Sequence, residues 1–212
     1  ARVAFASRPS RIAVAKSSSR ARCAGSSGLA ANSTGSIRVR LRTASGAATA
    51  MQANLAAGEL LAIRGRVIPS TLSNVTLVGS TDSGETLIGE TRVGNSSDRL
   101  RSLTLIPANP TAHPEAVRAI EDADLIVIGP GSLFTSIVPN LLISDILAAL
   151  AGSPAFKVYV CNVAEEPAQT EGYSVLDHLR VVQHYGGEDA VDAVLANNNM
   201  PKGSTPAGLD FI

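Results

Sequence analysis

The sequence contains few of the residues on which disulfide-rich and metal-binding proteins depend. Only two cysteines, Cys23 and Cys161, and three histidines occur in 212 residues, which provides neither a disulfide framework nor a zinc-binding spacing. Tryptophan is absent and aromatic residues make up 3% of the chain, so we expect an aliphatic core. Cys161 lies in an apolar segment, which indicates a buried thiol in a reducing compartment. No apolar run has the length of a membrane span, so no membrane partner is expected.

Acidic residues are missing from the first 48 residues, which carry nine Arg or Lys. The first acid is Glu59, and residues 49–212 carry nine basic and eighteen acidic residues, a net charge of −9. An acidic body of this kind argues against a nucleic-acid partner. The basic leader, residues 1–48, is predicted to be disordered, as an organelle transit peptide, an out-of-frame sequence or a natural tail. We expect a cytoplasmic protein, or a stromal one if the leader is a genuine transit peptide.

Strands and helices alternate in the second half of the chain. Continuous apolar runs predict buried strands at residues 125–128, 157–162 and 193–196. Apolar periodicity predicts helices at residues 115–122, 133–150 and 174–185, with Ser174 as the cap of the last. We therefore expect an α/β fold with a Rossmann-like parallel sheet, three adjacent central strands and helical crossovers.

The preceding residues predict a smaller antiparallel element. Strand-like runs at residues 75–79 and 86–93 flank the turn sequence TDSG at residues 81–84, which is typical of a β-hairpin. A further strand is predicted at residues 103–106, followed by a loop at residues 109–114. Upstream of the hairpin, residues 50–64 predict a helix and residues 66–69 a short strand ended by proline.

The most informative stretch is DLIVIGPGSLFTSIVPN, residues 124–140. A buried strand, a Gly-rich turn and a helix point backbone N–H groups toward an anion. Ser132, Thr135 and Ser136 add hydroxyl donors, so the turn is predicted to hold a phosphate or carboxylate. Such turns also form wherever a chain reverses tightly, and this one is neither GxGxxG nor a P-loop.

From about residue 49 onward, the sequence resembles the gluconeogenesis-factor family (YvcK-like) of the CofD-like superfamily. The motifs that carry the resemblance are RGRVIPST (64–71), GET (89–91), ADLIVIGPGSLFTSIVPNLL (123–142), VYVCNV (158–163), GY (172–173), DH (177–178) and VLAN (194–197). The resemblance implies a Rossmann-like domain that binds a nucleotide-linked ligand. In the bacterial members this ligand looks like a UDP-sugar, and the proteins are associated with cell shape and with growth on gluconeogenic carbon sources.

The superfamily also implies an alternative function. Related transferases move a 2-phospho-L-lactate group from a nucleotide diphosphate donor to a deazaflavin. Because the sequence offers no paired nucleophile and base, we favour a binding and regulatory protein and name no catalytic residue. A purely structural role is the third interpretation.

The sequence departs from the family in two places. The family's amino-terminal half, with its opening Gly-rich turn, is not recognisable in residues 1–48. Residues 49–212 are therefore expected to form the C-terminal portion of a CofD/YvcK-like domain, with an exposed strand edge that favours homo-oligomers. The loop after Asn162 also differs: the family pattern is close to TQPGET, whereas residues 165–170 read EEPAQT, with Ala168 and Gln169 in place of Gly and Glu.

The predicted ligand-binding residues lie in the Gly-rich turn and at the ends of neighbouring elements: Gly129, Pro130, Gly131, Ser132, Leu133, Thr135, Ser136, Asn140, Asn162, Tyr173 and His178. The two asparagines either orient a base or sugar or satisfy the backbone. Tyr173 resembles a ligand-contacting tyrosine of the family, and His178 is either a proton donor or structural. No metal site is predicted in the protein itself, although Glu165 and Glu166 either hold a divalent ion brought by a diphosphate or are solvated.

Overall fold

The computed structural model describes residues 12–15, 30–31, 37–38, 67–198 and 212. The helix predicted at residues 50–64 and Cys23 lie outside these residues. Within them, no single helix has the length and apolar composition needed to cross a membrane, although the bent pair Leu133–Leu141 and Ser144–Gly152 meets that test when taken together.

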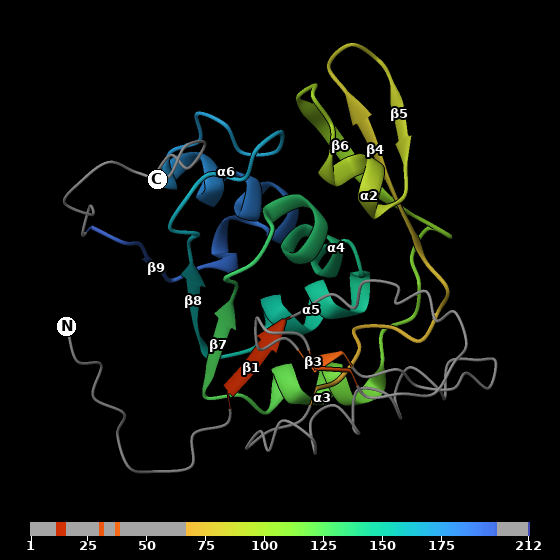
Figure 1. Ribbon diagram of the computed structural model, residues 1–212. Helices are drawn as coiled ribbons and strands as arrows, with labels where there is room; N and C mark the ends of the chain where they lie inside the picture. Colours follow the sequence, from red (N-terminus) through yellow and green to blue (C-terminus); the bar gives the residue numbers. More distant parts are fainter. Residues whose placement is uncertain (1–11, 16–29, 32–36, 39–66, 199–211) are drawn as a thin grey trace.

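A parallel sheet forms the centre of the fold (Figure 1). Its strand order is β1 (Ile12–Ala15), β7 (Leu125–Ile128), β8 (Phe156–Val160) and β9 (Ala193–Leu195). The three predicted strands are thus present, parallel and adjacent, which confirms that part of the fold prediction. Short apolar strands favour such a sheet because the helices that connect parallel strands cover the apolar side chains.

Strand β1 adds a fourth strand on the other side of β7. It pairs in parallel from Ile12 opposite Leu125 to Ala15 opposite Ile128. For these four residues the structure differs from the predicted disorder of residues 1–48. The physical reason is that a short apolar run can pair its backbone with an otherwise open strand edge.

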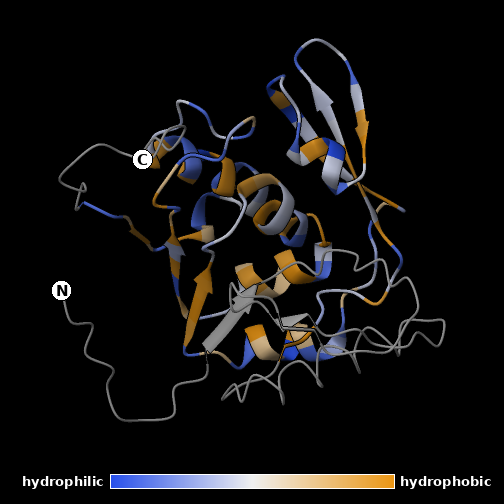
Figure 2. Ribbon diagram, in the orientation of Figure 1, coloured by the Kyte–Doolittle hydropathy of each residue, from blue (hydrophilic) through white to orange (hydrophobic). Residues whose placement is uncertain are grey.

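Helices α4 (Val138–Leu141), α5 (Ser144–Gly152) and α6 (Val175–Gly186) pack on one face of the sheet (Figure 1). Ile126 and Ile128 of β7 are buried against this layer, and Figure 2 shows that β7, α4 and α5 are largely hydrophobic. Leu125 and Val127, which alternate with them, are only half-buried. The continuous apolar run of β7 predicts a strand buried on both faces, whereas helices of the described ranges cover only one face of it.

The helix predicted over residues 133–150 is broken in two. A π-helical turn, η1 (Leu133–Ile137), precedes α4, and Ile143 has an extended backbone before α5 begins. The two parts are bent by 76°. Pro139 has no N–H to continue the regular ladder, and the N–H of Ile137 donates to the carbonyl of Ser132 at 3.0 Å. The prediction of one helix was wrong because apolar residues continue across the break, so the pattern does not mark it.

Three antiparallel strands form a projecting unit that we call the arm. Its order is β5 (Thr86–Ile88), β4 (Thr76–Thr81) and β6 (Leu100–Ile106) (Figure 1). The predicted hairpin is confirmed, with Gly84 in the turn at φ +89°. The second run, predicted to residue 93, is a strand only to Ile88. Helix α2 (Glu90–Gly94) follows and places the fully buried Val93 in the core.

The remaining predictions have mixed outcomes. No strand is present at residues 67–69, and Thr71 instead forms a single bridge with Ala112. Helix α3 (Pro114–Glu121) begins at its proline as expected. Helix α6 begins after Ser174, whose side chain accepts from the N–H of Asp177 while the Asp177 carboxylate accepts from the N–H of Ser174. This reciprocal cap confirms the predicted start of α6.

Candidate functional site

The Gly-rich turn lies at the carboxyl ends of β7 and β8, as the sequence predicted. Gly129 has φ +84°, and a Cβ atom there would lie 2.8 Å from the carbonyl oxygen of Val160. Only glycine fits, because both the positive φ and the backbone contact exclude a side chain. At Gly131 a Cβ would meet only the Cβ of Ser136, at 3.5 Å. The turn is therefore closed against the sheet at Gly129 and open at Gly131.

Asn162, at the carboxyl end of β8, fixes the conformation of the turn. Its Oδ1 accepts from the N–H of Gly131 at 3.2 Å, and its Nδ2 donates to the carbonyl of Gly131 at 3.0 Å. Nδ2 also lies 3.4 Å from Oε1 of Glu166. The predicted residues Gly131 and Asn162 are thus in direct contact, and Asn162 connects the turn to the loop at residues 163–172.

A row of hydroxyl and amide groups continues from the turn. Thr135 donates its hydroxyl proton to Oγ of Ser132 at 2.7 Å, and Ser132 donates to Oε1 of Gln169 at 3.1 Å. Gln169 was considered only as a departure from the family pattern, not as a site residue. Its position in that motif was the available signal. The contact spans 37 residues, so no local pattern predicts it.

Helix α2, which follows strand β5 of the arm, also borders this row of polar groups. A Cβ at Gly94 would lie 3.6 Å from Thr135 Cγ2 and 3.9 Å from Gln169 Nε2. The GET motif at the start of α2 was part of the resemblance, but the sequence did not show that this helix reaches the turn. Burial raises the pKa of Glu90, the first residue of α2. Helix α2 is therefore one wall of the candidate site.

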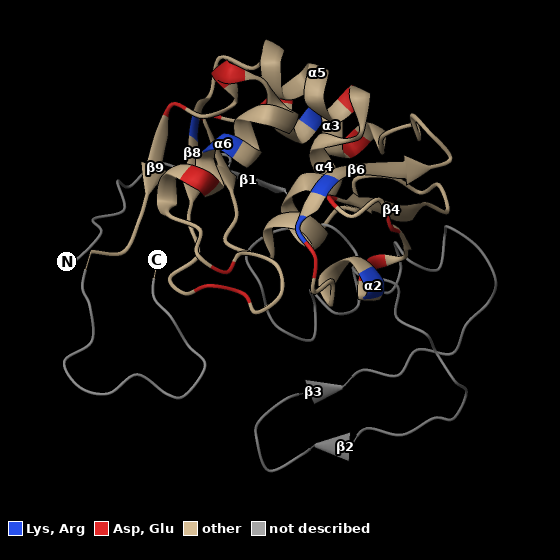
Figure 3. Ribbon diagram, turned by 90° about the horizontal axis from the view of Figure 1, so that it is seen from above, with Lys and Arg blue, Asp and Glu red and all other residues tan. Residues whose placement is uncertain are grey.

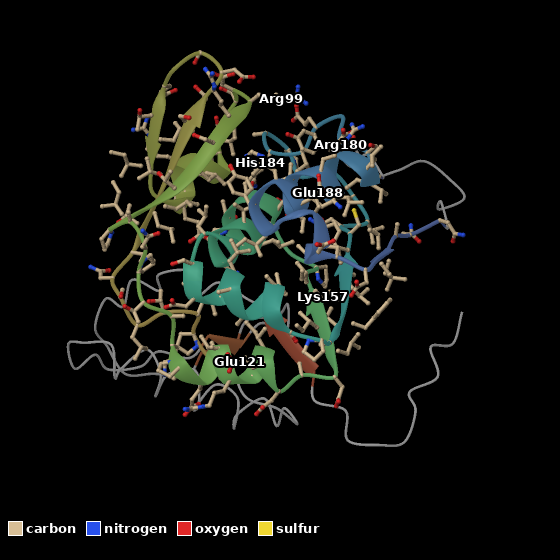
Figure 4. All side chains as sticks on the ribbon, turned by 180° about the vertical axis from the view of Figure 1, so that it is seen from behind. Arg99, Glu121, Lys157, Arg180, His184 and Glu188 are labelled. Atoms are coloured by element: carbon tan, nitrogen blue, oxygen red, sulfur yellow. The ribbon has the colours of Figure 1, made fainter. Side chains whose placement is uncertain are left out.

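Tyr173 is the centre of an aromatic cluster next to the turn. Its ring lies edge-on to Phe134 of η1 at 6.2 Å and to His178 of α6 at 5.6 Å. From the arm, the guanidinium carbon of Arg99 lies 5.6 Å from the centre of the Tyr173 ring, which is the geometry of a cation–π contact. Tyr173 also raises the pKa of Arg99. Figure 4 shows Arg99 near α6, which carries Arg180 and His184.

Other predicted site residues lie away from the polar row. Asn140 is 1% exposed, donates to the carbonyl of Ser136 at 2.7 Å and accepts from the hydroxyl of Ser70, so it satisfies buried groups. The side chain of Leu133 is fully buried, so only its backbone is available to a ligand. His178 is fully buried as well, and its Nδ1 lies 3.1 Å from the carbonyl of Ser174. Pro130 is exposed beside the turn, and Ser136 is half-buried.

Acidic residues mark the loop between β8 and α6, which is partly red in Figure 3 and carries Glu165, Glu166 and Glu171. In the part of the chain that the structure describes, no three His, Cys, Asp or Glu side chains gather into a metal site. A divalent ion carried by a diphosphate ligand stays a prediction. Cys161 is buried and free, as expected, and burial raises the pKa of its thiol. It is therefore an inert core residue.

Residues 11–207 match the model of the family described as 2-phospho-L-lactate transferase CofD. The match includes every element that surrounds the turn. It also extends into the leader predicted to precede the domain, so the predicted boundary near residue 49 stays a prediction.

Bacterial relatives carry the other name suggested by the motifs. The gluconeogenesis factor of Bacillus subtilis (strain 168) is 36% identical over 140 residues, which are 66% of this chain and 44% of the relative. A Nostoc sp. protein, also named in the gluconeogenesis-factor family, is 45% identical over 69% of this chain and 32% of its own length. A crystal structure of a UPF0052-family protein from Bacillus halodurans matches with a TM-score of 0.65 at 35% identity, covering 69% of this chain and 48% of that one. The chain thus spans between 32% and 48% of the length of these relatives.

Proposed function

We propose that this chain, which belongs to the CofD family, binds a nucleotide-linked ligand where β7 and β8 end, and that this ligand is a UDP-sugar. A regulatory role in cell shape and in growth on gluconeogenic carbon sources is part of the proposal, because the relatives are named gluconeogenesis factors. The observation that carries it is the polar row from Asn162 through Gly131 and Ser132 to Gln169. A small number of convergent polar groups is typical of small-molecule sites.

The pairing of the hydroxyl groups supports binding more than catalysis. Ser132 donates to an amide oxygen of Gln169, and an amide is not a base that could activate a nucleophile. The imidazole of His178 is buried and lies next to the carbonyl of Ser174. The Ser132 hydroxyl is therefore directed at an acceptor that cannot take its proton.

The name of the matching family, 2-phospho-L-lactate transferase CofD, favours a second candidate, a transferase of the phospholactyl type. In that reaction the turn would stabilise negative charge on the transferring phosphoryl group, with a divalent ion bound to the donor diphosphate. Incubation of the chain with a deazaflavin and a nucleotide-phospholactate donor, with Mg²⁺ or Mn²⁺, tests it. Absence of product under both metals excludes this candidate.

Calorimetry on the full 212-residue chain tests the main proposal, with UDP-glucose and UDP-N-acetylglucosamine as probes. The variant Gly131→Val adds a side chain where a Cβ meets only Ser136 at 3.5 Å, so the fold should tolerate it. We expect it to weaken binding at least about tenfold, because the added methyl groups occupy the open side of the turn.

Gly152→Val is the matched control, because a Cβ at this position meets no atom within 4 Å and lies outside the site. This variant should bind as the unmodified chain does. Equal affinity of Gly131→Val and Gly152→Val would show that the turn is not the ligand site. Failure of the unmodified chain to bind either UDP-sugar would contradict the proposed function.

A further inference from the structure

Three buried side-chain atoms have no hydrogen-bond partner among the described residues: the hydroxyl oxygen of Tyr159, Oε2 of Glu166 and Nε2 of His178. His178 belongs to α6, and the two oxygen atoms belong to residues that lie near the Gly-rich turn. Tyr159 has no exposed surface at all. Unpartnered buried polar atoms are costly and rare in native proteins, so each of them needs an explanation.

The two oxygen-bearing side chains lie near the same turn, Tyr159 next to Gly129 and Glu166 through Asn162. A Cβ at Gly129 would lie 3.6 Å from Cε2 of Tyr159. Glu166 approaches the turn through Asn162, which contacts Glu166 Oε1 and holds Gly131 by two hydrogen bonds. Burial raises the pKa of Tyr159 above its ordinary range, and the Cys161 thiol and the Glu166 carboxylate raise it further.

The chemistry of the two groups selects one kind of ligand group. A phenol both donates and accepts, whereas an ionised carboxylate only accepts. A hydroxyl group satisfies both, since it can donate to Glu166 and accept from Tyr159. A phosphate oxygen does not, because the carboxylate repels it. Uncharged polyols such as sugars present several hydroxyl groups of this kind.

We propose that Tyr159 and Glu166 form a subsite for the uncharged, hydroxyl-rich sugar moiety of the ligand, next to the turn that faces its diphosphate. This inference rests on the proposed function and adds to it which residues select the sugar. Both oxygens are closed from solvent, so binding of the sugar at this subsite requires a movement of the loop at residues 163–172, which carries Glu166.

The experiment compares UDP-glucose with UDP by calorimetry on the full chain. The unmodified chain should prefer UDP-glucose. Tyr159→Phe removes only the hydroxyl group and should lower the affinity for UDP-glucose about tenfold while leaving the affinity for UDP unchanged. Its melting temperature should be equal or higher, because the variant loses a buried group that had no partner. Glu166→Gln should reduce the preference for UDP-glucose as well, since a charge-assisted hydrogen bond is lost.

Tyr185→Phe is the matched control. The Tyr185 oxygen accepts from the N–H of Leu103 at 3.0 Å, so loss of this hydroxyl should lower the melting temperature and leave both affinities unchanged. A Tyr159→Phe variant that melts as low as Tyr185→Phe would show that the Tyr159 hydroxyl has a structural partner, and the inference would be wrong.

The remaining outcomes separate the two proposals. Equal affinities of the unmodified chain for UDP and UDP-glucose, or full retention of UDP-glucose binding by Tyr159→Phe, would overturn the sugar subsite and leave the nucleotide site intact. Equal weakening of both ligands would assign Tyr159 to the nucleotide and also overturn it. If the unmodified chain binds neither ligand, the proposed function itself fails.

Discussion

Ala168 has a φ of +66°, a left-handed conformation that a residue with a Cβ adopts only at a cost. It occupies the position at which the family pattern TQPGET has glycine. The backbone is held there by the N–H of Glu166, which donates to Thr170 Oγ1 at 2.8 Å, and by the N–H of Thr170, which donates to the Glu166 carbonyl at 2.9 Å. The loop that carries Glu166 and Gln169 therefore closes around a strained residue.

Ala168→Gly should raise the free energy of unfolding by about 1 kcal/mol, because glycine adopts positive φ without the Cβ penalty. Urea denaturation measures the change. Ala148→Gly, at an exposed position of α5, is a control for which we expect a change of opposite sign. It should lower the free energy of unfolding by about 1 kcal/mol, because glycine is unfavourable inside a helix. A loss of stability at both positions would show that residue 168 is not strained in solution.

At the scale of elements, the carboxylate of Asp98, which precedes β6, forms hydrogen bonds to the hairpin turn of the arm. Oδ2 of Asp98 accepts from the N–H of Ser83 at 3.0 Å, and Oδ1 accepts from the N–H of Arg99 at 2.8 Å. The hydroxyl and the N–H of Ser83 are the main causes that lower the pKa of Asp98 from 3.8 to about 2. Asp98 thus joins the β4–β5 turn to the residue that contacts Tyr173.

The stability of the arm should therefore decrease in acid. Because the pKa of Asp98 is lower in the folded state, its contribution is complete above the ordinary value of 3.8 and is lost as the pH falls toward about 2. Amide hydrogen exchange of β4 and β5 should show a loss of protection as the pH falls from 5 to 2. In the Asp98→Asn variant, the part of this pH dependence that comes from Asp98 should be missing. The same pH profile in both proteins would mean that other carboxylates control the arm.

At the scale of the whole molecule, one face of the parallel sheet is not covered by any helix of the described ranges. Leu125, Val127, Val158 and Val160 on this face are half-buried. Phe156 is 53% exposed and Leu195 is 57% exposed. Apolar residues grouped in this way promote association with another chain.

We predict that the 212-residue chain self-associates through this face. Light scattering after size-exclusion chromatography should give a mass above that of the monomer, and Leu195→Lys should shift it toward the monomer because it places a charge on the face. Ile88→Lys, at a position that is 58% exposed on the arm, should leave the mass unchanged. A monomeric parent chain, or dissociation by the Ile88 variant instead, would contradict the prediction.

Features that depend on neighbouring residues could be predicted from the sequence. Strands β7, β8 and β9 are short, mostly apolar runs between helical segments, a pattern that is typical of a parallel sheet. The turn at Gly129 was recognisable because glycine is required there by its positive φ. The start of α6 was recognisable because Ser174 and Asp177 form a cap within one turn of helix. In each case the determining contacts lie within a few residues.

Tertiary structure alone decided which of these elements meet. The break before α5 is visible only in the structure, because the apolar pattern of the sequence continues through it. Gln169 and Gly94 join the site through contacts with residues far away in the chain. That the oxygens of Tyr159 and Glu166 are buried without a hydrogen-bond partner can be seen only in the folded chain. The sequence by itself thus determined the elements and the turn, because these depend on local propensity, whereas packing determined the site, because its contacts form only when distant segments fold together.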